Sequence, residues 1–276
     1  MMSGILYVTG TPIGNLSDLS PRAAETLEKV DFIAAEDTRV TLRLLNHLGI
    51  KKPMVSYFEH NKRERGEIIC ARIEQGESCA IVTDAGMPCI SDPGEDLVRL
   101  CAARGIRTEV VPGPSAVIAA LAVSGLPTGR FTFEGFLSVN KKSRGEHLQS
   151  LLRETRTMIF YEAPHKLPAT LRDFYAAFGD RRLSIVRELT KVHEEVIRTT
   201  TAYAAAHYAD GSVRGEIVLV LEGFSQPEEA PAYTLEAAVT MAKEQMAEGK
   251  KATEAAKEAA AATGFKKNEI YRELML

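Results

Sequence analysis

Four short segments of the chain combine acidic, glycine and proline residues in patterns that could serve chemistry. They are "GTPIGNL" at 10–16, "EDTR" at 36–39, "TDAGMPCISDPG" at 83–94 and "PGPSA" at 112–116. None is a phosphate-binding loop with a Gly-Lys-Ser/Thr triplet, and "GTPIGN" has the wrong spacing for Gly-x-Gly-x-x-Gly. Each segment alone is typical of a turn. If all four follow strands of one sheet, they line one crevice, and their small residues favour an adenosine-type ligand held by backbone groups.

Side chains suited to acid–base chemistry occur in and after these segments. The candidates are Glu36, Asp37, Glu162, His165, Glu188 and Lys191. Each also has a structural alternative. Glu36 and Asp37 can cap the following helix or pair with Arg39, and His165 lies near an expected helix start. Glu188 and Lys191 can form a surface pair on one helical turn. No His, Cys and Asp cluster has metal-ligand spacing, so no metal site is predicted.

Strands and helices alternate through residue 127, which predicts an α/β fold with a mostly parallel sheet covered by helices. Strands are expected at 4–9, 32–35, 78–82 and 108–111, and helices after Ser20-Pro21, after 36–38, and at 61–75 and 95–103. Ser20 with Pro21 is a helix start. We expect Leu42, Leu45 and Leu48 on one side of the second helix, and Ser115 as the cap of a small-residue helix.

The pattern changes beyond residue 127. Strands are expected at 131–137, 158–161, 183–187 and 213–221, and helices at 145–155 and 164–178, with a shorter helix and turn in 199–212. The proline- and acid-rich stretch 225–233 reads as a linker. The tail has two alanine-rich helical segments and "TGFKKNEIYREL", which is compatible with a helix-turn-helix unit. We therefore predict an N-terminal α/β domain at 1–114, a C-terminal α/β domain at 115–223 and a helical tail at 234–276.

The bulk composition is that of a soluble globular protein. The 276 residues are 45% hydrophobic and 26% charged, a length that favours two domains. No apolar run is long enough to span a membrane, and the N-terminus lacks a secretion signal, so we expect a cytoplasmic protein without a membrane partner. The cysteines form no C-x-x-C pair and are expected to be reduced core thiols: Cys70, Cys79, Cys89 and Cys101.

Charge is unevenly distributed along the chain. The net charge of −3 argues against a uniformly basic nucleic-acid binder. However, residues 39–65 hold seven lysines and arginines, and Lys141-Lys142-Ser143-Arg144 is a second basic segment. Such runs are often solvated faces, yet they permit a polyanionic partner.

Seven motifs occur in one order over residues 4–223. They are "GTPIGNLSDLSPRAAETLEKVDFIAAEDTR", "DAGMPCISDPG", "VVPGPSA", "FEGFL", "FYEAPHK", "RELTKVHEE" and "RGEIVLVLEG". This series resembles the ribosomal RNA small subunit methyltransferase I family of the tetrapyrrole-methylase fold group. Two positions depart from the family pattern: Met87 stands where threonine is usual, and Ser138 where proline is usual after "GFL". Met87 lacks the threonine hydroxyl and its hydrogen bond.

The resemblance implies a two-domain α/β fold with S-adenosylmethionine (SAM) in the cleft between the domains. It also implies methyl transfer to the ribose 2′-oxygen of a cytidine in the decoding region of 16S ribosomal RNA. The cofactor contacts that it implies are Pro12, Ala85, Gly86, Met87, Ile90, Ser115, Ala116, Glu162, Gly215 and Glu216. The partner is then small-subunit ribosomal RNA or the assembled subunit, and the fold group suggests a homodimer.

SAM carries its own leaving group, so the protein must position the ribose and help to deprotonate it. We favour Asp37 and Lys191 as catalytic or RNA-orienting residues. The candidate RNA contacts are Arg39, Arg43, Lys141, Lys142, Arg144, Lys266 and Lys267.

Two other functions stay open at this point. One is a methyltransferase of a tetrapyrrole precursor or another small molecule. The absence of a "GxGxGxxxLLT" first loop, the basic segments and the helical tail argue against it. The other is a non-catalytic RNA-binding protein with a SAM-like pocket, and the intact acidic and lysine positions argue against that.

Overall fold

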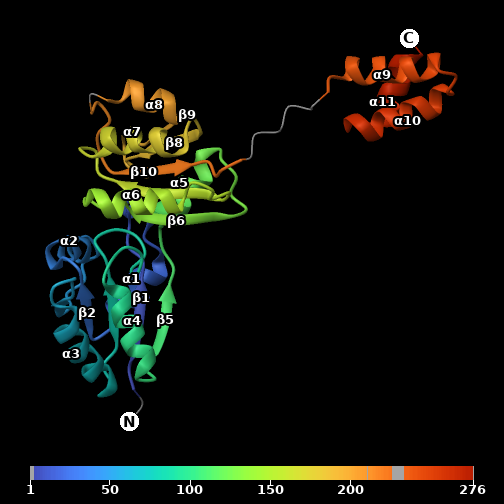
Figure 1. Ribbon diagram of the computed structural model, residues 1–276. Coiled ribbons are helices and arrows are strands. Elements are labelled where there is room, and N and C mark those ends of the chain that lie inside the picture. The colour runs from blue at the N-terminus through green and yellow to red at the C-terminus, as the bar shows by residue number, and fades with distance from the viewer. Residues whose placement is uncertain (1–2, 210, 226–232, 276) are drawn as a thin grey trace. The chain divides into compact units, whose positions relative to one another are not determined.

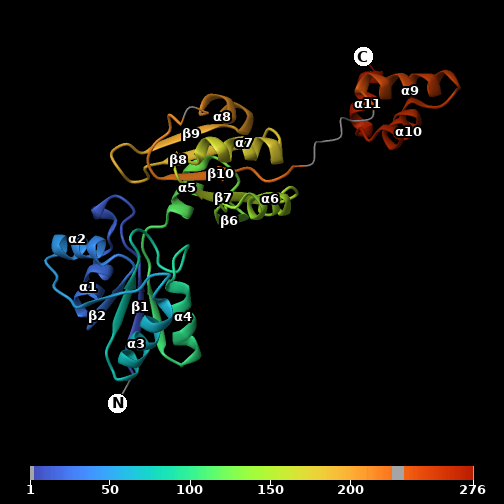
Figure 2. The ribbon, with the colours of Figure 1, turned by 60° about the vertical axis from the view of Figure 1, so that its left-hand side comes forward.

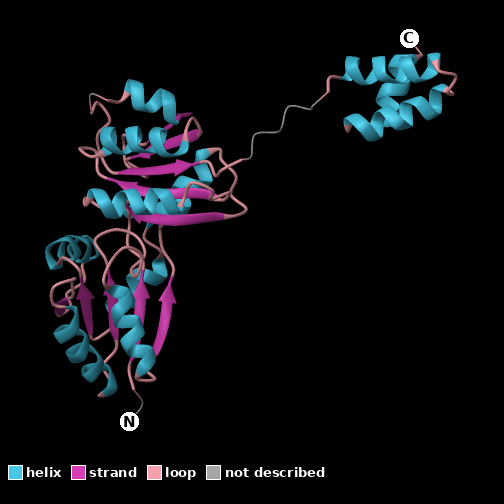
Figure 3. Cartoon of the chain, in the orientation of Figure 1, coloured by secondary structure: helices cyan, strands magenta, loops and turns pink. Residues whose placement is uncertain are grey.

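The computed structural model describes residues 3–209, 211–225 and 233–275 and consists of two compact units, Met1–Phe224 and Ser225–Leu276 (Figure 1). The first unit contains two five-stranded sheets, and the second is entirely helical (Figure 3). The strands of the first sheet lie within residues 5–111 and those of the second within residues 131–221. The domain limits at residues 114 and 223 stay a prediction.

The first sheet is entirely parallel, with the strand order β3-β2-β4-β1-β5. Its strands are β1 (Ile5–Thr9), β2 (Phe32–Ala35), β3 (Met54–Ser56), β4 (Cys79–Val82) and β5 (Arg107–Val111). Every residue of β2 and of β4 is buried. A parallel sheet is covered on both faces, so its central strands are continuous apolar runs. The predicted parallel sheet is confirmed.

Helices cover both faces of this sheet (Figure 2). They are α1 (Pro21–Lys29), α2 (Thr38–Leu48), α3 (Lys62–Glu74) and α4 (Gly94–Ala103), and a 3-10 turn, η1 (Leu16–Asp18), precedes them. The Ser20 hydroxyl accepts a hydrogen bond from the Ala23 N–H, which confirms the predicted start of α1. Of the three leucines expected on one side of α2, Leu45 is buried, whereas Leu42 is 46% exposed. Thr41 is the other buried residue of this helix.

The second sheet is mixed, with the strand order β6-β7-β10-β8-β9. Its strands are β6 (Phe131–Phe136), β7 (Thr157–Glu162), β8 (Arg182–Arg187), β9 (Glu195–Thr200) and β10 (Ile217–Leu221). Only β6 and β7 run parallel. The strand predicted at 213–221 is shorter than expected because Gly215 adopts a φ of 92° in a turn before β10.

The helices around the second sheet form two layers. They are α5 (Ala116–Ser124), α6 (Lys141–Ser150), α7 (Leu167–Phe178) and α8 (Thr201–His207). The core of α6, α7 and α8 lies on one face of the second sheet, and α5 packs on the other. Ile13, from the loop at 10–16 (the first loop), lies beside α5. Ser115 precedes α5 as predicted, but its hydroxyl makes no capping hydrogen bond.

Two strands were missed by sequence patterns. β3 is three residues long, and β9 is an edge strand of polar character, "EVIRTT". An edge strand exposes one side to water, so it lacks the apolar run that identifies a central strand. Long-range pairing with β2 and β8, respectively, forms these strands.

The described part of the second unit forms three helices, α9 (Leu235–Ala247), α10 (Ala252–Thr263) and α11 (Lys267–Leu274). They share a core of their own, in which alanines surround Val239 and Ile270. The two alanine-rich helices and the helix in "TGFKKNEIYREL" are confirmed. Most of the predicted linker, residues 226–232, lies outside the described residues.

Candidate active site

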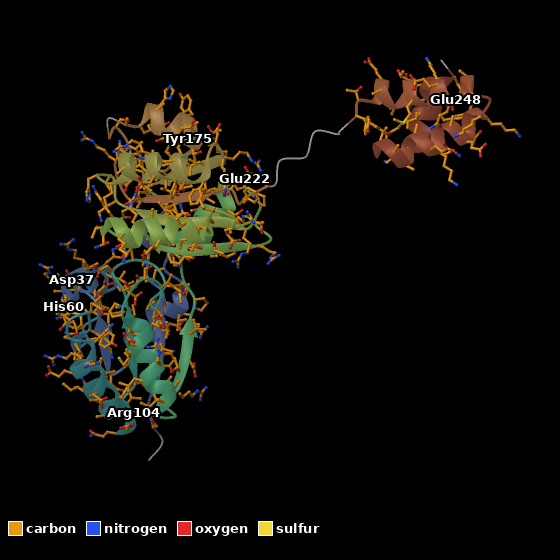
Figure 4. The ribbon with its side chains drawn as sticks, in the orientation of Figure 1. Asp37, His60, Arg104, Tyr175, Glu222 and Glu248 are labelled. Carbon is orange, nitrogen blue, oxygen red and sulfur yellow. The ribbon has the colours of Figure 1, made fainter. Side chains whose placement is uncertain are left out.

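The four loops that the sequence singled out meet at the carboxyl edge of the first sheet. Thr11 and Gly86 exchange backbone hydrogen bonds of 2.9 and 3.1 Å, which joins the first loop to the 83–94 loop. The Asp37 N–H donates to Asp84 Oδ1 at 3.1 Å, which brings in "EDTR". Figure 4 shows Asp37 at this edge of the first sheet and Arg104 at the opposite edge. Parallel strands end at one edge, so their loops assemble there.

The "PGPSA" loop joins this cluster through close glycine packing. A Cβ on Gly10 would lie 2.7 Å from the Cα of Gly113, so the two backbones touch only because both residues are glycine. The Gly113 N–H donates a hydrogen bond to the Met87 sulfur at 3.2 Å. The sulfur of Met87 is therefore an acceptor at the position where the family pattern has a threonine hydroxyl.

The first loop also reaches the second sheet. The Ile13 side chain packs in the apolar core of the second sheet with Leu189. A Cβ on Gly14 would lie 2.5 Å from the Cγ of Lys191, so this glycine permits a close approach between the two loops.

A pocket of about 380 Å³ lies where the loops meet the second sheet, a size typical of small-molecule sites. It is lined by Ile13, Ala85, Ala116, Phe136, Tyr161, Glu162, Ala163, Pro164, Val186, Leu189, Glu216, Ile217 and Val218. Most of these side chains are apolar. No chemical signal in the sequence pointed to the apolar ones, although Phe136 and Tyr161 belong to the motifs "FEGFL" and "FYEAPHK".

The predicted cofactor residues fall into three groups. Ala85, Ala116, Glu162 and Glu216 line the pocket. Gly86, Ser115 and Gly215 are their chain neighbours, and Gly86 has a φ of 89°. Pro12, Met87 and Ile90 are not among the lining residues. Pro12 lines a different hollow beside α2, Met87 packs against the core of the first sheet, and Ile90 is 48% exposed.

An aromatic wall forms one side of the pocket. The Tyr161 ring lies 4.9 Å from the ring of Phe133 and 5.4 Å from that of Phe136, measured between centroids. Burial raises the pKa of the Tyr161 phenol. The hydroxyl therefore stays protonated, and the wall offers flat apolar surface for a ring.

Glu162 is a buried carboxylate with its own partners. It is 5% exposed, accepts a 2.8 Å hydrogen bond from the Ala163 N–H, and accepts another from the Thr170 hydroxyl. These bonds fix the turn that leads from β7 into α7. Glu162 thus shapes the pocket wall and is a poor candidate for a mobile acid or base.

Lys191 lies at the rim of the pocket between two carboxylates. Its Nζ is 3.1 Å from Glu188 Oε1 and 2.9 Å from Glu216 Oε2, and Glu188 Oε1 also accepts the Glu216 N–H. Burial opposes the charge, but the bonds to Glu216 and Glu188 outweigh it and raise the pKa of Lys191. The side chain is therefore a fixed cation at neutral pH.

Glu188 and Lys191 lie in the loop that follows β8, and not on a helical turn as the sequence allowed. Glu188 and Thr190 adopt left-handed φ angles of 51° and 65°. Left-handed residues other than glycine are uncommon and concentrate at functional sites. Cys89 and Ser91, in the 83–94 loop, form a second such pair at 73° and 66°.

Asp37 takes the structural alternatives that its sequence position left open. Its Oδ1 accepts the Arg39 N–H at 2.8 Å and caps α2, and its Oδ2 lies 2.6 Å from Arg39 Nη2. The hydrogen bonds from Arg39 lower the pKa of Asp37 to about 2. A carboxylate that holds its charge so firmly is a weak proton acceptor.

Asp84 and Asp92, two carboxylates of the 83–94 loop, were not selected from the sequence. Asp84 is adjacent to the pocket residue Ala85, and burial followed by the charge of Glu36 raises its pKa. Asp92 accepts the N–H groups of Cys89, Ile90 and Gly94 and so folds the end of its loop. The signal was present in "TDAGMPCISDPG", where both aspartates flank the turn residues.

The predicted RNA contacts are not equally available. Lys141, Lys266 and Lys267 are exposed, as is Arg43. Lys142 is 3.9 Å from Glu146. Two of the arginines form ion pairs: Arg39 pairs with Asp37, and Arg144, only 14% exposed, pairs with Asp173 at 2.5 Å. Their contact with RNA stays a prediction. These internal pairs could not be seen in the charge pattern, because their partners are set by the tertiary fold.

Within the described ranges, no group of three or more His, Cys, Asp or Glu side chains is placed to hold a metal ion. The same residues include no helix long and apolar enough to cross a membrane. Cys70, Cys79 and Cys101 are buried in the core and Cys89 is half-buried, all as free thiols.

Comparison with known proteins agrees with this architecture. Residues 5–205 match the family model of the Tetrapyrrole (Corrin/Porphyrin) Methylases. Among solved structures, uroporphyrin-III C-methyl transferase from Thermus thermophilus, complexed with S-adenosyl homocysteine, has a TM-score of 0.57 at 18% identity. That match covers 79% of this chain and 97% of the other. Diphthine synthase has a TM-score of 0.58 at 14% identity, over 80% of this chain and 90% of its own.

Curated relatives are much closer in sequence. Ribosomal RNA small subunit methyltransferase I of Synechocystis sp. is 45% identical over 98% of this chain and 96% of the relative. The Pseudomonas aeruginosa relative of the same name is 43% identical over 100% and 98%. The Thermotoga maritima relative is 48% identical over 80% of this chain and 99% of its own length, so about a fifth of this chain has no counterpart there. The chain belongs to the tetrapyrrole methylases and, within them, to the ribosomal RNA small subunit methyltransferase I family.

Proposed function

We propose that this protein is a SAM-dependent methyltransferase that methylates the ribose 2′-oxygen of a cytidine in the decoding region of 16S ribosomal RNA. The observation that carries the proposal is the pocket between the interlocked loops and the second sheet, with the Lys191 cation at its rim. The names of the full-length relatives support ribosomal RNA as the substrate. Such a substrate implies a cytoplasmic enzyme, and the homodimer stays a prediction.

The pocket fits the proposed cofactor. Its walls are mainly apolar, and the aromatic surface of Phe136 and Tyr161 suits an adenine ring. The left-handed Gly86 and the touching glycines 10 and 113 bring backbone groups close to the pocket, where larger residues would fill space. Bound SAM would supply an electrophilic methyl group on a sulfonium, and Ala85, Ala116, Glu162 and Glu216 would contact it.

The chain's own residues would then activate and place the ribose. We infer that Lys191 stabilises the negative charge that develops on the 2′-oxygen, because its ammonium stays charged and is fixed by two carboxylates. We assign Asp84 as the candidate proton acceptor, since its raised pKa makes it a stronger base than Asp37. Asp37 would act as an orienting residue that holds Arg39 toward the RNA.

The proposal is tested by following labelled methyl groups from SAM. The purified enzyme is incubated with small-subunit RNA or assembled subunits, and the RNA is hydrolysed in alkali. A 2′-O-methyl group blocks alkaline cleavage, so the label is expected in a resistant dinucleotide that contains cytidine. Label in a base, or transfer only to a tetrapyrrole precursor, would contradict the proposed reaction. No transfer to any acceptor, with SAM bound, would indicate a non-catalytic RNA-binding protein.

A further inference from the structure

A groove of about 740 Å³ runs between α6 and α7 on the helical face of the second sheet. Its lining includes Leu148 and Ala169, which give an apolar floor, and Val139, which is 79% exposed at one end. Lys141 and Lys166 also line it, from the beginnings of the two helices. The groove therefore combines an apolar floor with a basic rim.

The one carboxylate among the groove's lining residues is neutralised from within. Asp173 accepts a 2.5 Å hydrogen bond from Arg144 Nε, and Arg144 Nη2 donates to the Thr170 hydroxyl at 3.0 Å. Lys141 and Lys166 have no ionic partner within the part of the chain that the structure describes. The uncompensated charge of the groove is positive, which suits a polyanion.

The groove and the pocket lie on opposite faces of the second sheet, and the chain segments that follow β6 and β7 contribute residues to both. Ala163 and Pro164 line the pocket, and the next two residues in the chain, His165 and Lys166, line the groove. In the same way, Phe136 lines the pocket, and Ser138 and Val139 shortly after it line the groove. A polymer whose acceptor unit sits at the pocket would thus pass around this edge of the sheet, beside the 57% exposed Phe136 ring, to reach the groove.

We propose that this groove binds the single-stranded RNA segment next to the methylated nucleotide. Lys141 and Lys166 contact phosphates, while Val139 and the apolar floor contact bases, as in other single-strand sites that pair a basic rim with apolar or aromatic surface. The role of Arg144 is then to neutralise Asp173 rather than to contact RNA. This assignment rests on the proposed function, because the RNA carries the acceptor ribose.

The first test compares two double variants with the same loss of charge. Lys141→Ala with Lys166→Ala removes the basic rim. Lys51→Ala with Lys52→Ala is the control. Residues 51 and 52 precede β3, so they lie at the amino edge of the first sheet, opposite the edge that carries the four loops. RNA binding is measured over a series of salt concentrations. The groove variant should bind RNA about tenfold more weakly, and its salt slope should fall by about 1.4, roughly 0.7 for each phosphate contact.

The stabilisation by SAM should be the same in both variants and the wild type, which shows that the pocket is intact. A groove variant that binds and methylates RNA like the control would overturn the assignment. Failure of the proposed function is a separate result: the wild-type enzyme itself would transfer no label to small-subunit RNA.

A second test identifies what occupies the groove. A photoreactive benzophenone amino acid replaces Val139, and the control carries it at Ile68 on α3, which is 39% exposed. After irradiation with assembled small subunits, RNA should be crosslinked at position 139 and not at position 68. A crosslink from position 139 to a protein of the subunit would assign the groove to a protein partner and overturn the RNA assignment.

Discussion

The ammonium of Lys191 lies 2.9 Å from the carboxylate of Glu216, a residue that lines the pocket. A second carboxylate, that of Glu188, holds the same ammonium from the other side at 3.1 Å. Two carboxylates place the cation more firmly than one, because each limits the rotamers that the long side chain can adopt. Lys191 is therefore preorganised at the rim before any substrate binds.

Replacement of Lys191 by methionine should lower turnover by about 10²-fold, because one preorganised charge is removed from the reacting oxygen. SAM affinity should change little. The matched control is Lys62→Met, since Lys62 has the same 29% side-chain exposure and also pairs with two carboxylates, but neither of these carboxylates lines the pocket, whereas Glu216 does. Single-turnover methylation is measured for both. Equal rates in the two variants would exclude a role for Lys191 in the reaction.

Asp84→Asn should lower turnover by about 10²–10⁴-fold if Asp84 accepts the ribose proton. A base works in its ionised form, so the raised pKa of Asp84 should place the acid limb of the wild-type rate profile above the ordinary aspartate range near 3.9. Asp31→Asn is the control, because Asp31 also accepts one backbone N–H, at 2.7 Å from Ser78, but precedes β2. If the acid limb of the rate–pH profile is unchanged in Asp84→Asn, another residue accepts the proton.

Asp37→Asn should make stability less sensitive to acid. The folded-state pKa of Asp37 is about 2 and its ordinary value is 3.8, so its ion pair with Arg39 stabilises the fold above pH 4. That stabilisation is lost as the pH falls through about 2. Urea unfolding between pH 5 and pH 2 should show a shallower fall for the variant. Glu154→Gln is the parallel case, because hydrogen bonds from Arg156 lower the pKa of Glu154 to about 2 as well. An Asp37→Asn curve parallel to that of the wild type would contradict the assigned pKa.

Gly86→Trp should abolish the rise in melting temperature that SAM or its demethylated product gives without metal. Gly86 has a φ of 89°, and a Cβ there would lie 3.3 Å from the Cγ2 of Ile13, so a large side chain must enter the pocket region. Gly49→Trp is the control: Gly49 is also left-handed, at 71°, but a Cβ there meets no atom within 4 Å. Both variants carry the same kind of backbone strain, about 1–2 kcal/mol. A normal SAM response in Gly86→Trp would remove this loop from the site.

Truncation should separate the helical tail from cofactor binding. The cut belongs after Phe224 rather than Gly223, because the Phe224 N–H donates to the Glu154 carbonyl and its ring lies 5.5 Å from the Arg181 guanidinium carbon. SAM binding should be unchanged, since residues beyond 224 form a separate unit with its own core. We expect weaker RNA methylation and a shallower salt dependence.

The charge of the tail is tested in the full chain. Lys266→Glu with Lys267→Glu should reproduce most of the effect of truncation, because both lysines are exposed where α11 begins. Lys243→Glu with Lys257→Glu makes the same charge change at exposed positions of α9 and α10 and is the control. Wild-type RNA affinity and salt slope in the truncated enzyme would assign the tail a structural role.

Local sequence patterns predicted the features that depend on neighbouring residues. Apolar runs such as "FIAA" identified the buried central strands, and Ser20 with Pro21 identified a helix start, because burial patterns and caps are local. The alternation of such elements fixed the parallel sheet. It also placed the four turn-rich loops at one edge, since parallel strands all end on the same side. A ligand site at this edge could therefore be predicted from the sequence, without knowledge of any interatomic distance.

Which side chains are free to act depends on contacts between segments that are distant in the chain. Arg144 and Arg39 have the same charge in the sequence as Lys141, yet both arginines are paired with carboxylates. Asp173 is 29 residues from Arg144 in the chain, and Glu216 is 25 residues from Lys191. The Met87 sulfur likewise accepts from a backbone N–H that is 26 residues away. Hydrogen bonds and ion pairs act over a few ångströms in space, so their partners, and with them the pKa of each acid, are set by how distant segments pack rather than by the order of residues.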